Sequence, residues 1–167
     1  MTRWILICLV AAPMAAAQEL PYSPEATEAC LAKAILPSED EACNGTSAQL
    51  CIDTPDGYTT VGMGFCLGHE RDYWDARLNA AYGQLMEIEK SVDDEMTKLG
   101  SSVPSSVEAL RNMQRAWITF RDSACAYVRV QWGGGSGGGP AVANCQMVMT
   151  GQQALRLEYR LEEKLVR

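Results

Sequence analysis

Gln114-Arg115-Ala116-Trp117-Ile118-Thr119-Phe120-Arg121-Asp122-Ser123-Ala124-Cys125 is the stretch that decides the fold. Apolar residues recur in and around it at steps of three and four, which is the spacing of one face of an amphipathic helix. The members of this face are Leu110, Met113, Trp117, Phe120 and Ala124, followed by Tyr127 or Val128. Trp117 and Phe120 are expected in the core, because aromatic residues at helical spacing usually bury most of their surface. The closing cysteine allows a covalent link to another segment. The stretch therefore predicts the central helix of a small, oxidised, all-helical domain.

The first seventeen residues have the features of an export signal. Arg3 supplies a positive start, residues 4–12 form an apolar run too short to span a bilayer, and Ala15-Ala16-Ala17 matches a cleavage site. Cys8 follows Ile7 inside the apolar run, which disfavours a lipoprotein signal. We expect a signal peptide over 1–17 and a mature chain that is periplasmic or secreted. A membrane anchor is the alternative, and the short run disfavours it.

The mature chain is acidic. Without Arg3 it has thirteen basic and 21 acidic residues, a net charge of −8. Such a charge disfavours a nucleic-acid partner and suits a cationic protein. Solubility alone explains the charge equally well.

Three long helices are predicted from the apolar periodicity and from the glycine and proline residues between them. The first extends from Thr60 to Leu99 and has a heptad-like apolar seam. The second extends from about Ser105 to Gln131 and the third from about Ala141 to Leu165, with Gly151 as a candidate interruption. The glycine-rich run 133–140 predicts a flexible connection. The expected fold is all-α: a three-helix, up-down-up bundle over 59–167.

A cysteine-rich N-terminal arm over 18–58 precedes the bundle. Short helices are expected at Glu25 to Leu36 and at Thr46 to Ile52. Six cysteines remain in the mature chain, and an even number in an exported protein indicates disulfides, with fifteen possible pairings. They are Cys30, Cys43, Cys51, Cys66, Cys125 and Cys145.

The expected helix order favours one pairing among these cysteines. Antiparallel helices would bring Cys125 close to Cys145, and closing that loop would stabilise the fold by roughly 3 kcal/mol. In the arm we favour the two local pairs, Cys30 with Cys43 and Cys51 with Cys66. The chain lacks a CxxC pair and has one histidine. These observations disfavour a zinc site, and we expect no metal or other cofactor.

Polar residues of the helices admit a binding or a structural interpretation. An ion pair between Arg121 and a carboxylate of the long helix is favoured over a binding site that includes Asp122. Asn79 and Tyr82 lie one turn apart and could form a polar patch with Arg121. A buried hydrogen-bond network is the favoured interpretation of this patch. Catalysis finds little support, because the only histidine, His69, has no predicted nucleophile beside it.

The spacing of these residues resembles the lysozyme inhibitor LprI-like domain over about Cys51 to Leu165. The matching positions are Cys66, Leu78-Asn79-x-x-Tyr82-x-x-Leu85, Gln114-Arg115-Ala116-Trp117-Ile118-x-Phe120-Arg121-Asp122-x-x-Cys125 and, after a glycine-rich loop, Cys145. The resemblance implies a small, exported, helical and disulfide-bonded bacterial protein. It makes Asn79, Tyr82, Gln114, Trp117, Arg121 and Asp122 motif residues with a structural or binding role. In one departure, Gln153 stands where the family pattern usually has arginine.

The resemblance and the charge together lead to one expected function. We expect a non-enzymatic protein that inhibits lysozyme and binds this cationic enzyme through an acidic helical surface. The alternative is a periplasmic structural or envelope-stress binding module with another partner. An enzyme centred on His69 is the third and least favoured hypothesis.

Overall fold

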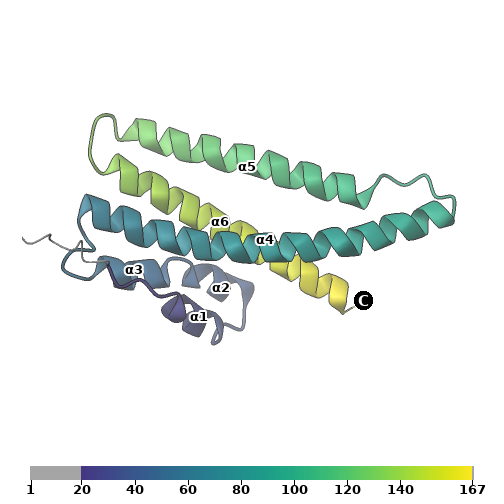
Figure 1. Cartoon of the computed structure of the whole chain (residues 1–167), viewed down its shortest axis with the longest axis horizontal. Coiled ribbons are helices and arrows are strands. Elements are labelled where there is room, and N and C mark those ends of the chain that lie inside the picture. Colours follow the sequence, from purple (N-terminus) through teal and green to yellow (C-terminus); the bar gives the residue numbers. More distant parts are fainter. Residues whose placement is uncertain (1–19, 167) are drawn as a thin grey trace, which may run out of the picture.

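The centre of the fold is a pair of long helices, α4 (Thr60–Lys98) and α6 (Gly138–Leu165). They are seen in a computed structural model that describes residues 20–166, so the predicted signal peptide lies outside the described residues. Figure 1 shows that α6 lies against α4 along much of its length and crosses it. The largest buried side chains of α4 are Trp74, Leu78 and Leu85. They pack in one cluster with the buried hydrophobic residues of α6, which are Met147, Ala154, Leu155, Leu157 and Leu161.

Helix α5 (Ser106–Gln131) carries the motif from which a central helix was predicted. The prediction that this helix is the central one is wrong. Only Gln114 and Cys125 of α5 are fully buried, and Trp117 is partly buried against the core. Phe120 is 64% exposed, so its predicted place in the core is also wrong. Each residue turns the helix by about 100°, so Phe120 points well away from the narrow face that meets α6.

Three short helices form the arm: α1 (Glu25–Leu31), α2 (Pro37–Cys43) and α3 (Thr46–Ile52). They lie on one side of α4, and α5 lies on the other (Figure 1). The all-α fold with an up-down-up order of α4, α5 and α6 and a stapled arm is confirmed. The helix expected from Glu25 to Leu36 ends earlier, at Leu31. Helix α2, which was not expected, begins at Pro37, because the missing amide hydrogen of proline is tolerated at the first helical position.

The bounds of the long helices follow from their caps. The hydroxyl of Thr59 accepts a hydrogen bond from the amide of Gly62 at the start of α4, and Ser105 accepts one from Glu108 at the start of α5. Helix α6 continues through Gly151, where an interruption was expected. A Cβ atom at Gly151 would lie 2.3 Å from Nδ2 of Asn44, so glycine is needed there for the arm to approach α6.

Three disulfides connect the six cysteines of residues 20–166. They join Cys30 to Cys43, Cys51 to Cys66, and Cys125 to Cys145, which are the predicted pairs. The first closes the arm on itself, the second ties the arm to α4, and the third ties α5 to α6. Two of the three cross-links therefore connect the outer elements to the central pair.

Candidate functional site

The first motif residue of α5 makes a polar contact in the interior. Nε2 of Gln153 on α6 donates a hydrogen bond of 3.0 Å to Oε1 of Gln114, and both side chains are buried. Buried amides of this kind need partners, and each supplies the other with one. The contact gives the glutamine of the motif a structural role at the α5–α6 interface.

The centre of the motif is a layered arrangement on the surface of α5. The guanidinium of Arg121 lies over the ring of Trp117, 5.0 Å from its centroid, and donates hydrogen bonds of 2.8 and 3.0 Å to Asp122. The expected ion pair between Arg121 and a carboxylate of α4 is absent from the contacts of the described residues. Arg121 instead covers the partly buried tryptophan, as cation–π pairs commonly do.

The two motif residues of α4 are not brought to Arg121. Asn79 is exposed, and its amide donates a hydrogen bond of 2.8 Å to Asp75, one turn earlier. Tyr82 is half-buried against the core. Within residues 20–166, neither side chain makes a hydrogen bond to Arg121, so the structure does not assemble the expected polar patch.

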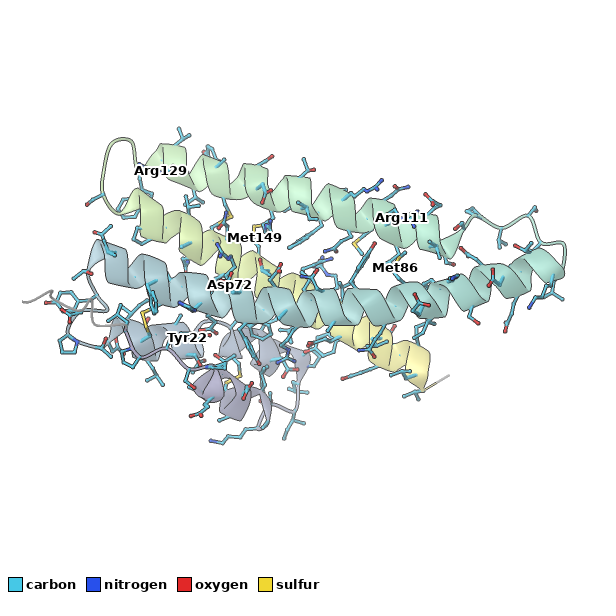
Figure 2. All side chains as sticks on the ribbon, viewed as in Figure 1. Tyr22, Asp72, Met86, Arg111, Arg129 and Met149 are labelled. Carbon is cyan, nitrogen blue, oxygen red and sulfur yellow. A yellow bond between two sulfur atoms is a disulfide. The ribbon has the colours of Figure 1, made fainter. Side chains whose placement is uncertain are left out.

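The glycine-rich run between α5 and α6 forms a short turn built around Trp132. Figure 2 shows Arg129 at this end of α5. Its guanidinium donates to the carbonyl oxygens of Gly133 and Gly135. A Cβ atom at Gly137 would lie 2.3 Å from the ring of Trp132, so the turn folds closely around the tryptophan. Sequence composition alone indicated a linker, and the contacts of Arg129 and Trp132 give it a defined shape.

A buried carboxylate that sequence analysis did not single out joins the arm to α4. Glu70 is 0% exposed, and its side chain accepts hydrogen bonds from the Thr27 hydroxyl and from the backbone amides of Gly45 and Ala48. Gly45 and Ala48 lie at the start of α3, where backbone amides lack partners within the helix. Glu70 therefore caps α3 from a different helix.

Tyr22 and His69 lie next to this carboxylate. Burial, and then the negative charge of Glu70, raises the pKa of the Tyr22 phenol. The exposed ring of His69 stacks on Tyr22 at 5.4 Å and approaches Phe65 at 4.1 Å. All six described cysteines are in disulfides, so none is free to act as a nucleophile beside His69.

Two features are absent from residues 20–166. No group of three or more His, Cys, Asp and Glu side chains is placed to hold a metal ion. None of the helices described there is long and apolar enough to cross a membrane.

Charge is divided between the two sides of α4. The arm, from Leu20 to Tyr58, has seven carboxylates and a single basic residue, Lys33. Helix α5, on the opposite side in Figure 1, has four arginines and two carboxylates. The arm is therefore the strongly acidic surface of the molecule, and the motif helix is mildly basic.

A groove of about 590 Å³ opens where α4, α5 and α6 separate. It is lined by apolar residues such as Leu110 and by the cationic residues Arg156, Arg160 and Lys164. Nζ of Lys164 lies 2.8 Å from Glu89, which neutralises one of these cations.

Comparisons with known proteins agree with the motif. The family model described as Lysozyme inhibitor LprI matches residues 51–157. An uncharacterized protein of Rhizobium meliloti (strain 1021) is 26% identical over 110 residues, which cover 66% of this chain and 79% of that protein. An uncharacterized 17.7 kDa protein from the puhA 5' region of Rhodobacter capsulatus is 24% identical over 133 residues, which cover 79% of this chain and 82% of that protein. No solved structure matches the chain significantly.

Proposed function

The chain belongs to the lysozyme inhibitor LprI family, and from this premise we propose that it is an exported, non-enzymatic protein that binds and inhibits lysozyme. Lysozyme cleaves its polysaccharide between two active-site carboxylates. An inhibitor must therefore cover the cleft that holds them. We place the contact on the arm because negative charge is concentrated there.

The arm offers a cationic enzyme an electrostatically complementary surface. Its carboxylates include Glu25, Glu28, Glu41, Asp53 and Asp56, all exposed. Complementary potentials steer two proteins together and favour one orientation. Because exposed charges are screened over about 8 Å at physiological ionic strength, binding through this surface should weaken as salt increases.

The disulfides support the same proposal, because they hold the acidic helices in place before binding. One joins Cys30 of α1 to Cys43 of α2, and another joins Cys51 of α3 to α4. A surface that is already ordered loses less conformational entropy on association. The oxidised protein should therefore bind lysozyme more tightly than the reduced protein.

A lysozyme turnover assay with the oxidised mature chain tests the proposal. The variant Glu28→Gln/Glu41→Gln removes two charges from the arm and should reduce the apparent affinity by about tenfold at physiological salt. The matched variant Glu87→Gln/Glu95→Gln removes two exposed charges from the far part of α4. It should have a much smaller effect, because only the arm is proposed to contact the enzyme.

A negative result would be equally clear. If a tenfold molar excess of the folded, oxidised protein does not slow lysozyme, the chain is not an inhibitor of that enzyme. Recovery of one other envelope protein by the immobilised chain would then favour the alternative, a binding module with a different partner.

A further inference from the structure

Helix α5 carries a second row of apolar and small residues, separate from the face that packs on α6. We call it the outer seam, and it consists of Ala109, Met113, Ala116, Phe120, Ser123 and Tyr127. The steps along it alternate between four and three residues, which is the heptad spacing of helices that pack side by side. All six residues are exposed, with Phe120 at 64% and Tyr127 at 65%. Single exposed apolar residues are ordinary, but a repeating exposed seam indicates a contact surface.

The outer seam is free of charge. The charged residues of α5 lie on its other faces: Arg121 covers Trp117, and Arg115 and Asp122 project from the side turned away from the seam. A partner helix could therefore cover the seam without removing an unpaired charge from water, which would otherwise be costly. The least exposed of the three large members, Met113 at 39%, has its sulfur 3.5 Å from the amide of Gln153 and marks the boundary with the buried face.

Large and small residues alternate along the seam. The large residues are Met113, Phe120 and Tyr127, each seven positions from the next. The small residues are Ala109, Ala116 and Ser123, also seven positions apart. The seam therefore presents a regular series of projections and hollows. A partner helix with the same series in reverse order would place each of its large residues opposite a small residue of the seam.

A second copy of the same helix, running antiparallel, has this reversed series. Phe120 of one copy then faces Ala116 of the other, and the pairs Met113 with Ser123 and Tyr127 with Ala109 fall in the same register. The two residue numbers have the same sum in all three pairs, so a single two-fold axis satisfies them together. Isologous dimers have this property, because each contact occurs twice with the roles of the copies exchanged.

We propose that the outer seam of α5 binds the α5 helix of a second copy of this chain, forming an antiparallel two-fold dimer. A parallel pairing in register would place Phe120 against Phe120 and leave the alanines facing each other. In Figure 1 the acidic arm lies on the opposite side of α4 from α5, so the two arms of the dimer point away from each other. The proposal does not depend on lysozyme binding, and the dimer leaves both arms accessible.

The size of the contact sets the expected strength. From Ala109 to Tyr127 the seam is about 27 Å long at 1.5 Å per residue. One helix from each copy places the interface in the small class, below about 1,200 Å² in total, where association is weak and reversible. We therefore expect a dissociation constant in the micromolar range, roughly 1 to 100 μM.

Sedimentation equilibrium of the oxidised mature chain over about 1 to 300 μM tests this range directly. The wild type should fit a monomer–dimer equilibrium. Phe120→Glu places two charges at the centre of the contact and should weaken dimerisation at least tenfold. The matched variant Ala126→Glu adds the same charge at an exposed position of α5 outside the seam and should dimerise like the wild type. Circular dichroism of both variants checks that the helices remain folded.

An exchange of the large and small residues tests the register. Ala116→Phe alone and Phe120→Ala alone should each weaken the dimer, and the double variant Ala116→Phe/Phe120→Ala should restore it, because these positions face each other. A wild type that stays monomeric at the highest concentration overturns the proposal, as does equal weakening by Ala126→Glu or a double variant that is not restored. Loss of lysozyme inhibition on Phe120→Glu, with a monomeric wild type, would assign the seam to the enzyme instead.

Discussion

The side-chain amide of Gln153 donates a hydrogen bond across 3.0 Å to the side-chain oxygen of Gln114, and both residues are almost completely buried. The contact joins α6 to α5 at a point where the two helices otherwise meet through a narrow face. Hydrogen bonds depend on direction as well as distance. The pair therefore favours one register of α5 against α6.

Replacing one member of this pair should cost more than replacing both. Gln114→Ala leaves the amide of Gln153 without its partner, and we expect the free energy of unfolding to fall by about 1–3 kcal/mol. Gln114→Leu combined with Gln153→Leu removes both polar groups and should be closer to neutral. Urea unfolding measures both changes. Gln152→Ala, an exposed neighbour on α6, is the control and should change stability by less than about 0.5 kcal/mol. A double variant as unstable as the single one would contradict this account.

The bounds of α4 and α5 and the disulfides were predictable from local signals. Thr59 and Ser105 cap α4 and α5, and glycine and proline separate the helices, so the ends of these helices follow from residues within a few positions. The pairing of Cys125 with Cys145 follows from the antiparallel order of two consecutive helices. Each of these features depends on residues close together in the chain or on short connections.

The position of α5 was not predictable, because its sequence contains two apolar faces. One includes Leu110 and Trp117, which pack on the core, and the other includes Met113 and Phe120, which are exposed. The two faces lie side by side on the helix, so a search for apolar residues at steps of three and four merges them. Which face is buried depends on α6, and α6 matches the first face through the long-range contact between Gln114 and Gln153.

The role of Glu70 was hidden for a related reason. It is one of eight carboxylates on α4, and periodicity does not distinguish it from an exposed neighbour such as Asp72. Its function depends on α3, whose first amides reach it only after the arm has folded against α4. A carboxylate that caps a helix elsewhere in the chain has no local sequence signal.

The buried carboxylate should be the main polar anchor of the arm. Glu70→Gln keeps the shape of the side chain but places an amide group where backbone amides now donate, and we expect a loss of about 2–4 kcal/mol in the free energy of unfolding. Amide hydrogen exchange at Gly45 and Ala48 should accelerate more than at residues of α5. Asp72→Asn, an exposed change on the same helix, should have an effect near zero. Unchanged protection at Gly45 and Ala48 in the Glu70 variant would show that the arm does not depend on this carboxylate.

At the other end of α4, Asp93 connects the helix to the start of α5. Its carboxylate accepts hydrogen bonds from the hydroxyl of Ser105 at 2.5 Å and from the backbone amides of Ser106 and Val107 at 2.8 and 3.1 Å. The hydroxyl of Ser105, followed by the amide of Ser106, holds the pKa of Asp93 below its usual range. These amides lack partners within α5, so Asp93 acts as a second cap for that helix.

The lowered pKa of Asp93 predicts a specific loss of stability in acid. A carboxyl group whose pKa is lower in the folded state stabilises the protein fully above its unfolded pKa, near 4, and loses that contribution as pH falls through the folded pKa. The side chain of Asp93→Asn is neutral at every pH. The variant should therefore be less stable than the wild type at pH 7, and its stability should fall less steeply below about pH 4.

Urea unfolding at several pH values between about 7 and 2 measures the two slopes. Asp94→Asn, an exposed change one residue away, should keep the steep acid dependence of the wild type. The backbone amides of Ile35 and Leu36 also lower the pKa of Glu39, and this group leaves a residual slope in every variant. Identical acid slopes for the wild type and Asp93→Asn would show that the cap does not couple folding to protonation.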